Sequence, residues 1–506
     1  MTIPVIDHFI NGQRRAPSPD ASTSNVFNPA TGQVIAHVKA ARSAEVNQAV
    51  AGAAAAFEAW SQMSLGRRTA VLFAFRQLLA AGTDELAKIV VREHGKVLDD
   101  ARGEVGRGLD VVDFACGIPE LLKGSYSPQV STDFDVYSFR EPLGVVAGIT
   151  PFNFPVMVPL WMAPLAIATG NTFILKPSKQ DPSASLFLAD LWTKAGLPDG
   201  VFQVIQGGRG SVADLLIHPD IRAISFVGST PVARHIHQVG TSHGKRVQAL
   251  GGAKNHAVIL PDADLDFAAA STVAAAFGAA GQRCMAIATA VVIDAVADDF
   301  VEQVVAKARN VKVADGMTPG VDMGAVISQA ARDRIEDTVD SAQRDGAAIV
   351  LDGRGWRPAD SPEGFFTGPT VIDHVRPGMR AYDEEIFGPV LTVVRVRDLD
   401  EALCLVNANP YGNGAVVFSA SGGDARRFVR GVNAGMIGVN VPIPVPVPYY
   451  SFGGWKDSLI GESHIYGPDG VRFYTRAKVI TQRWPSQSPS QSQSQGASFH
   501  FASASS

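Results

Sequence analysis

The residue of this chain best suited to covalent chemistry is Cys284, in the run Gly281-Gln282-Arg283-Cys284-Met285. The cation at Arg283 can lower the pKa of the thiol, which reacts as the thiolate. A thiolate can attack a carbonyl carbon and form a covalent intermediate. A lone cysteine in an alanine-rich segment is more often a small buried apolar residue, so the rest of the chain has to decide between the two interpretations.

The segments around this cysteine predict an α/β fold. Apolar strands alternate with helical segments ahead of it, which is typical of a doubly wound parallel sheet. The expected strands cover residues 145–149, 172–175, 201–205 and 223–227, and the expected helices begin near Ser183, Ser211 and Pro231. Two further strands, at 257–260 and 288–293, flank a helix from 265 to 280 and predict a second α/β domain.

Three other segments have recognisable patterns. Residues 44–60 and 66–97 carry apolar residues at helical spacing and predict two surface helices. Residues 134–139 alternate apolar and polar side chains, as in a half-exposed strand or hairpin of the kind that often pairs with another chain. Residues 485–506 alternate Ser, Gln and Pro, which predicts a disordered tail.

Composition excludes several classes of protein. The chain has 506 residues, 46% of them hydrophobic, which is too long for one compact core and suits a multidomain enzyme. The 44 Lys and Arg against 49 Asp and Glu give a net charge of -5 without a basic run, so nucleic acid is not an expected partner. The longest apolar stretch, 154–168, contains three prolines, so no membrane span is expected. Three widely spaced cysteines, Cys116, Cys284 and Cys404, favour a reducing compartment and a cytoplasmic location. No metal site is expected.

Three loops at strand ends are candidates to hold a ligand. The run Gly207-Gly208-Arg209-Gly210-Ser211 lacks the G-x-G-x-x-G dinucleotide pattern, so a plain turn is an equal alternative. The Gly228-Ser229-Thr230 run begins a helix, where free N–H groups can bind a pyrophosphate, although these residues also cap helices for structural reasons. Lys176 could reach a ribose or a phosphate, and a solvated lysine at a strand end is the alternative.

Six motifs together resemble those of the aldehyde dehydrogenases, and the resemblance runs from about His8 to Trp484. The motifs are Thr150-Pro151-Phe152-Asn153-Phe154-Pro155, Lys176-Pro177-Ser178, Gly228-Ser229-Thr230, Gly281-Gln282-Arg283-Cys284, Glu384-Glu385-Ile386-Phe387-Gly388-Pro389 and Asn409-Pro410-Tyr411-Gly412. Within that superfamily the chain is similar to the CoA-acylating methylmalonate-semialdehyde dehydrogenases. The runs that carry this second likeness are Gly252-Ala253-Lys254-Asn255-His256, Cys284-Met285-Ala286 and Val439-Asn440-Val441-Pro442-Ile443-Pro444-Val445-Pro446.

The resemblance implies a fold in three parts. A Rossmann-like cofactor domain would comprise residues 8–123 and 143–251, with about 446–465 returning to it, and an α/β catalytic domain would comprise 252–445. Residues 124–142 and 466–484 would form a β-hairpin oligomerisation arm. Pairing of this arm across subunits would cover an open strand edge, and a homotetramer built as a dimer of dimers is expected.

The resemblance also assigns roles to single residues. Cys284 would attack an aldehyde, and the Asn153 side chain with the Cys284 backbone N–H would stabilise the oxyanion. Glu385 would bind the nicotinamide ribose and Phe387 would hold the nicotinamide; without the motif, Glu385 in its acidic run would be interpreted as a surface residue. The other cofactor-binding residues would be Thr150, Pro151, Phe152, Lys176, Ser178, Lys179, Gly228, Ser229 and Leu250. The substrate-binding residues would be Arg107, Arg283, Phe154 and Phe452.

The position of Leu250 bears on the product. Hydrolytic relatives have a glutamate thirty-four residues before the cysteine as general base for water, and this chain has Leu250 there. Leucine cannot accept a proton, so water attack would lose roughly 10²–10⁴-fold in rate, whereas a thiol acceptor needs less help. The acyl group is therefore expected to pass to coenzyme A. A hydrolytic semialdehyde dehydrogenase, with His256 as a base near in sequence, and a non-enzymatic relative of the crystallin type are the alternatives; the retained Cys284, Asn153 and Glu385 speak against the second.

The sequence constrains the identity of the substrate and the choice between NAD and NADP less tightly. The substrate implied by the resemblance carries a carboxylate, and Arg107 and Arg283 offer the fork that a carboxylate accepts. Loss of carbon dioxide at the thioacyl stage would give propionyl-CoA from methylmalonate semialdehyde and acetyl-CoA from malonate semialdehyde. For Arg107 an exposed helix arginine is the alternative. NAD-preferring relatives carry a glutamate where this chain has Lys179. NAD is the expected cofactor, and NADP stays possible because the repulsion of a 2′-phosphate is gone.

Overall fold

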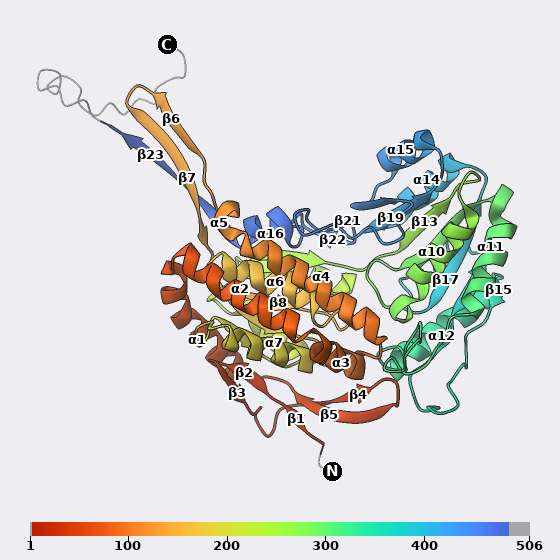
Figure 1. Ribbon diagram of the computed structural model, residues 1–506, viewed down its shortest axis with the longest axis horizontal. Coiled ribbons are helices and arrows are strands. Elements are labelled where there is room, and N and C mark those ends of the chain that lie inside the picture. The colour runs from red at the N-terminus through yellow and green to blue at the C-terminus, as the bar shows by residue number, and fades with distance from the viewer. Residues whose placement is uncertain (1–2, 485–506) are drawn as a thin grey trace, which may run out of the picture.

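The computed structural model describes residues 3–484, so the segment 485–506, for which a disordered tail is predicted, lies outside the described residues. Two α/β lobes lie side by side, and a narrow arm of strands projects away from the first of them (Figure 1). No helix within residues 3–484 is long and apolar enough to cross a membrane. The same residues contain no group of three or more His, Cys, Asp or Glu that could hold a metal ion.

The first lobe is built on an eight-stranded sheet with the order β22-β12-β11-β8-β9-β10-β2-β3. Its five central strands are parallel, and the strands at the two edges are antiparallel. The chain winds outward from β8 in both directions, which places a switch point between β8 and β11, where α/β proteins bind ligands. The strands are β2 (His8–Ile10), β3 (Gln13–Arg15), β8 (Val145–Ile149), β9 (Thr172–Lys176), β10 (Phe202–Val204), β11 (Ile221–Val227), β12 (Arg246–Leu250) and β22 (Leu459–Ile460).

Helices cover both faces of this sheet, and each face has its own hydrophobic core. The predicted single helix over 66–97 is wrong, because the chain breaks at Gly82 into α2 (Leu65–Ala81) and α3 (Thr83–His94). The Thr83 hydroxyl donates to the carbonyl oxygens of Leu79 and Ala80, at 3.2 and 3.0 Å, which the end of α2 leaves without helical partners. The remaining helices of this lobe are α1 (Ser43–Gln62), α4 (Leu98–Cys116), α5 (Ile118–Leu121), α6 (Met157–Ala168), α7 (Ser183–Lys194), α8 (Arg209–Ile217), α9 (Thr230–Ser242) and α16 (Gly467–Phe473).

The second lobe has a seven-stranded sheet with the order β15-β16-β17-β14-β13-β19-β20, parallel except at β15. Its strands are β13 (Asn255–Ile259), β14 (Ile287–Ile293), β15 (Ala348–Leu351), β16 (Thr370–Asp373), β17 (Val390–Val396), β19 (Gly414–Phe418) and β20 (Met436–Val439). Its helices are α10 (Leu265–Phe277), α11 (Asp294–Arg309), α12 (Gln329–Arg344), α13 (Arg380–Asp383), α14 (Leu399–Ala408) and α15 (Gly422–Gly431). The helix predicted to reach residue 280 ends at Phe277, and a 3-10 turn, η1 (Gly278–Gly281), follows it. The predicted fold class, two α/β units with doubly wound parallel sheets, is confirmed.

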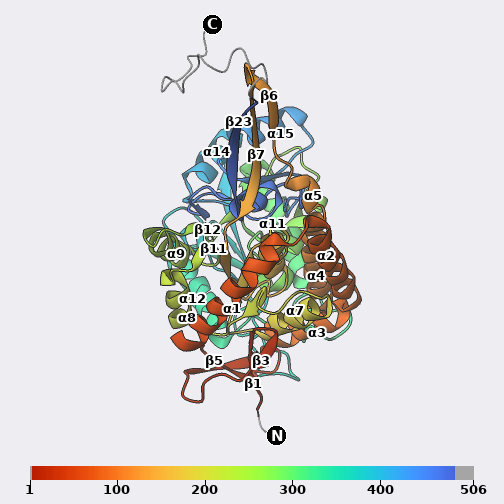
Figure 2. The ribbon, with the colours of Figure 1, turned by 90° about the vertical axis from the view of Figure 1, so that its left-hand side faces the viewer.

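Three small sheets complete the molecule. β6 (Tyr126–Ser131), β7 (Phe134–Pro142) and β23 (Thr475–Arg483) form the arm, and β1 (Val5–Ile6), β4 (Thr23–Asn28) and β5 (Gln33–Lys39) form a sheet at the opposite end. Figure 2 shows these two small sheets at opposite ends of the body. A two-stranded ribbon joins β18 (Tyr411–Gly412) to β21 (Trp455–Lys456). Helix α16, which the predicted arm includes, packs against α6 of the first lobe.

Candidate active site

The turn that carries Cys284 has an unusual backbone. Ala279, Ala280 and Gly281 all have positive φ, at 48°, 52° and 67°. A left-handed conformation costs about 1–2 kcal/mol for a residue with a Cβ, so the two alanines need support from their surroundings. A Cβ on Gly281 would lie 2.1 Å from the carbonyl oxygen of Gly388, which leaves room only for glycine. The main chain before the cysteine is therefore tightly specified.

Side chains from neighbouring strands fix the other side of this turn. The amide groups of Asn255 and Asn413 each donate to the carbonyl oxygen of Cys284, at 3.0 Å. Asn255 begins β13, and Asn413 lies between β18 and β19. Residues at the strands of the second lobe thus fix the backbone carbonyl group of Cys284.

The Cys284 thiol itself does not have the lowered pKa expected from its neighbour. Burial, followed by the charge of Glu385, raises its pKa to about 12, and the backbone N–H groups and Arg283 only partly oppose this rise. The Arg283 guanidinium donates to Asp100, at 2.5 Å, so a carboxylate already compensates its charge. Arg283 lowers the pKa of this thiol in the predicted direction, but burial and the charge of Glu385 outweigh it. Sequence proximity revealed neither the burial nor Asp100.

A cavity of about 360 Å³ opens onto the cysteine. Both predicted substrate arginines line it, together with Phe154, which is also predicted to bind the substrate. Arg107 reaches it from α4, donates to the carbonyl oxygen of Val445 at 3.2 Å and lies 3.6 Å from Asp110. The structure therefore brings the two arginines to one cavity, with an acidic residue beside each of them.

Phe452 lies behind this cavity. It is 3% exposed, and its ring centroid is 4.8 Å from that of Trp161, which lines the cavity. Phe452 is not among the lining residues, so it supports the wall through Trp161.

The loop with Asn153 connects β8 to α6. Asn153 is buried, and its carbonyl oxygen accepts a hydrogen bond from the Lys96 ammonium at 2.7 Å. At the start of α6, Glu104 accepts from the backbone N–H groups of Val156 and Met157, at 2.8 and 3.1 Å. Lys96 and Glu104 form an ion pair of 2.7 Å with both side chains fully buried. Sequence reasoning missed Lys96, which lies between α3 and α4, and Glu104, which lies on α4. Both belong to a charged stretch of the kind that is also typical of a protein surface.

Glu385 and Phe387 follow α13 and line a small recess together with Cys284. The Glu385 carboxylate accepts from the Ala253 N–H at 3.0 Å, and burial raises its pKa to about 7. Phe387 has a φ of 54°, and its ring packs edge-on against Phe152 at 5.8 Å. Both residues of the predicted nicotinamide site are thus next to the cysteine.

The carboxyl ends of β8, β9 and β11 form a second group of predicted residues. Thr150 directly follows β8 and has a buried hydroxyl with no partner among the described residues, and Pro151 comes next. Lys176 ends β9, where burial lowers its pKa to about 8. Ser229 precedes α9 and makes no side-chain cap, so the first N–H groups of that helix stay available for an anion. These donors and the unpaired hydroxyl fit a dinucleotide.

Leu250 and Ser178 shape the same region. Leu250 ends β12, is 3% exposed, and its carbonyl oxygen accepts from the Gly228 N–H at 3.1 Å. The Ser178 hydroxyl accepts from the Gln180 N–H at 3.0 Å and so fixes the loop after β9. Both residues thus bind backbone N–H groups of the loops that follow β11 and β9.

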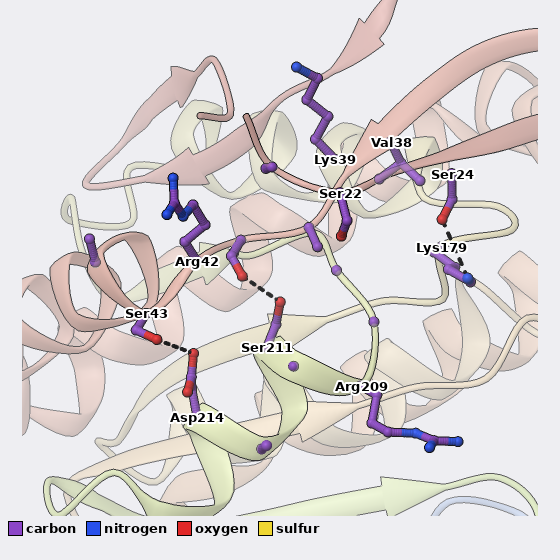
Figure 3. A pocket seen from close by; sticks show the side chains of 18 of the residues that line it. Ser22, Ser24, Val38, Lys39, Arg42, Ser43, Lys179, Arg209, Ser211 and Asp214 are labelled. Atoms are coloured by element: carbon purple, nitrogen blue, oxygen red, sulfur yellow. Dashed lines mark hydrogen bonds between the residues drawn. The ribbon is translucent and has the colours of Figure 1, made fainter. Parts of the chain in front are cut away.

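A second cavity, of about 850 Å³, lies between the small N-terminal sheet and the loop before α8. Lys179, Lys39, Arg42 and Arg209 line it, and Figure 3 shows Lys179 reaching toward Ser24 of β4. The distance between Lys179 Nζ and Ser24 Oγ is 3.4 Å. The Arg42 guanidinium is 2.6 Å from a carboxylate oxygen of Asp20. The Gly207–Ser211 run lines this cavity, and its last three residues form the first turn of α8. Lys39 and Arg42 escaped the sequence reasoning because only the folded chain brings the N-terminal strands to this loop.

Comparisons with known proteins agree with this geometry. The family model described as the aldehyde dehydrogenase family matches residues 17–480. The chain is 51% identical to a malonate-semialdehyde dehydrogenase of Pseudomonas aeruginosa over 95% of this chain and 96% of that protein.

Two solved structures are similar over nearly their whole length. A methylmalonate-semialdehyde dehydrogenase of Oceanimonas doudoroffii is 48% identical with a TM-score of 0.94, over 96% of this chain and 99% of the other. A Sinorhizobium meliloti 1021 protein assigned to the methylmalonate-semialdehyde dehydrogenases and solved in complex with NAD is 46% identical with a TM-score of 0.94, over the same shares.

Proposed function

The chain belongs to the aldehyde dehydrogenase family, and on this premise we propose that it oxidises malonate or methylmalonate semialdehyde with NAD and passes the acyl group to coenzyme A. The names of its relatives support the substrate. The observation that carries the second half of the proposal is the buried leucine at position 250.

The first steps use Cys284 and Asn153. The thiol releases its proton to water in the cavity that opens onto Cys284, and the sulfur attacks the aldehyde carbon to form a thiohemiacetal. The negative charge on the former carbonyl oxygen is met by the Asn153 amide and the Cys284 backbone N–H, and loss of such a donor typically costs roughly 10²–10³-fold in rate. The dinucleotide, when bound, supplies the hydride acceptor, and a thioacyl enzyme remains.

Residues at two strand ends and one helix start would hold that dinucleotide. Ser229 and the α9 N-terminus suit the pyrophosphate, and Thr150 and Lys176 offer polar groups beside it. Glu385 and Phe387 would hold the nicotinamide end, next to the cysteine.

The fate of the thioacyl group depends on which base is available to water. Leu250 offers none, and His256 is buried on β13, where burial lowers its pKa to about 3 and its ring packs 5.8 Å from that of Tyr382. Glu385 is the remaining candidate near the sulfur, and the nicotinamide ribose would occupy it. Coenzyme A brings a thiol that reacts without such a base.

Product analysis with and without coenzyme A tests this proposal. We expect acyl-CoA with coenzyme A present and little turnover without it. Equal turnover to free acid in its absence would establish the hydrolytic alternative, with Glu385 as its base.

The carboxylate of the substrate would meet Arg107 and Arg283 in the 360 Å³ cavity. A β-carboxyl group on the thioacyl intermediate can leave as carbon dioxide, and protonation of the resulting carbanion gives the propionyl or acetyl group. A substrate panel with and without a carboxylate tests this: Arg107→Met and Arg283→Met should raise KM for semialdehydes and leave KM for acetaldehyde nearly unchanged.

NAD is the proposed cofactor, supported by the NAD complex of the Sinorhizobium relative. The cations around Lys179 would also accept a 2′-phosphate, so NADP stays the alternative. The ratio of kcat/KM for the two cofactors decides between them.

We further propose a homotetramer, because β6 at the arm's edge is exposed along its whole length and an unpaired edge favours pairing with another chain. Light scattering after gel filtration measures the assembly. The cytoplasmic location inferred from the cysteines stays a prediction.

A further inference from the structure

Helix α4 contacts both halves of the catalytic centre without reaching the sulfur. In Figure 1 it crosses the first lobe with its N-terminal end toward the second lobe. Asp100 and Glu104 lie one turn apart on α4, and residues at this spacing share one face of a helix. Asp100 binds the nucleophile turn, and Glu104 binds the loop of Asn153.

Asp100 joins both sides of the left-handed turn. One carboxylate oxygen accepts from the Ala279 N–H at 3.0 Å, and the other accepts from Arg283 at 2.5 Å. The turn that delivers Cys284 from the second lobe is therefore anchored to a helix of the first lobe.

Glu104 and Lys96 do the same for the oxyanion loop. Glu104 binds two consecutive N–H groups at the start of α6, and Lys96 links Glu104 to the carbonyl oxygen of Asn153. The Lys96 ammonium also lies 4.5 Å from the centre of the Phe154 ring. Every polar group of this ion pair is satisfied by the loop that carries the oxyanion donor, although a buried ion pair is by itself weak evidence for stability.

We propose that Lys96 and Glu104 are positioning residues, which set the Asn153 amide against the nucleophile turn that Asp100 holds on the same helix. Glu104 lies among the residues that line the 360 Å³ cavity, but its carboxylate is fully buried and binds Lys96 and the N–H groups of Val156 and Met157. The pair therefore acts through the backbone of residues 153–157. This inference rests on the proposed roles of Cys284 and Asn153.

Removal of this pair should slow only those reactions in which an oxyanion develops. A misplaced Asn153 weakens every step in which a carbonyl oxygen becomes negative, and it leaves the intrinsic reactivity of the thiol unchanged. Alkylation of Cys284 by iodoacetamide develops no oxyanion, whereas acylation by p-nitrophenyl acetate does. The two reactions therefore separate positioning of Asn153 from general damage.

The test compares Glu104→Gln and the double variant Lys96→Met/Glu104→Gln with the wild type. The double variant removes both charges at similar volume, so it keeps the test valid if the single variant, with an uncompensated buried ammonium, fails to fold. Asp113→Asn is the matched control, because Asp113 is an ion-paired acid of the same helix that binds Arg76 at 2.8 Å, away from both loops.

We expect the double variant to lose roughly 10–100-fold in kcat for the semialdehyde and in the p-nitrophenol burst rate, as for a weakened oxyanion donor. Its KM for the semialdehyde and its alkylation rate should stay within about threefold of wild type, since the double variant keeps Arg107, Arg283 and Cys284 and changes Glu104 to an amide of similar volume. The control should match wild type in all four measurements.

Two results would overturn the proposal: a burst rate of the double variant within twofold of wild type, or an alkylation rate that falls in proportion to kcat. Failure of the proposed function has a different signature. If Cys284→Ala retained the burst and the dehydrogenase activity, the nucleophile itself would be misassigned. The burst needs neither semialdehyde nor coenzyme A, so it still tests the positioning pair if the substrate proposal fails.

Discussion

Replacing Leu250 with glutamate should convert part of the CoA-dependent reaction into hydrolysis. Leu250 ends β12, in the hydrophobic cluster that includes Met285 and against which Cys284 packs. A carboxylate here would place a base beside the thioacyl group, where general bases contribute roughly 10²–10⁴-fold. The expected change is therefore a new turnover to free acid without coenzyme A.

Burial sets the size of this gain. The Leu250 side chain is 3% exposed, so burial should raise the pKa of the new carboxyl above its ordinary value near 4.3. Only the ionised form is a base, so the hydrolytic turnover should increase as the pH rises through this elevated pKa. We expect a gain of about 10–100-fold at the high-pH end of the profile and little gain at the low-pH end. Loss of the buried leucine should lower the free energy of unfolding by roughly 1.5–3 kcal/mol.

The assay measures nicotinamide reduction and free acid without coenzyme A for Leu250→Glu and for Leu250→Gln, which has nearly the same shape and no basic group. A gain confined to the glutamate variant, rising with pH, is the expected result. Equal rates for the two variants would refute the argument that the missing carboxylate directs the acyl group to a thiol.

Three further changes have definite expected results. Lys179→Glu should raise the NAD to NADP ratio of kcat/KM by at least about tenfold, because a carboxylate repels a 2′-phosphate; an unchanged ratio would remove Lys179 from cofactor recognition. Glu385→Gln should speed alkylation of Cys284 by up to about tenfold near pH 8, since the Glu385 charge raises the pKa of that thiol; a slower reaction would contradict this assignment. Gly281→Ala should lower kcat by tenfold or more and destabilise the protein by about 1–3 kcal/mol, because its Cβ would meet the Gly388 carbonyl oxygen and its φ is 67°; kcat and a thermal melt check both, and wild-type values would show that the turn is not constrained.

Much of the fold was predictable from local pattern. Strand β8 has the predicted bounds of residues 145–149, and the helix predicted to begin near Ser183 begins there. Buried parallel strands are continuous apolar runs, so such a segment is visible in the sequence. The helix predicted over 66–97 was wrong because its apolar spacing continues across Gly82, and only the Thr83 hydroxyl bonds to the preceding carbonyl groups show how the chain accommodates the break.

The candidate site also has a part that was predictable from the sequence and a part that was not. Motif residues such as Cys284, Asn153 and Glu385 could be named from the sequence, and the structure places Cys284 and Glu385 on one recess. The thiol pKa could not be predicted, because Arg283 is adjacent in sequence whereas Asp100 and the burial that outweighs it come from distant parts of the chain.

The sequence by itself predicted the nucleophile, and it determined the leucine at position 250 and the alternation that makes an α/β fold, since each depends on residue type and short-range spacing. Only the tertiary structure decided how the reactive groups are held. Lys96, Asp100 and Glu104 lie in an ordinary charged stretch of the sequence. They become anchors of the loops that carry Cys284 and Asn153 because folding brings α4 and the segment before it against both lobes. Desolvation and charge compensation depend on what surrounds a group in space, and linear spacing does not encode that.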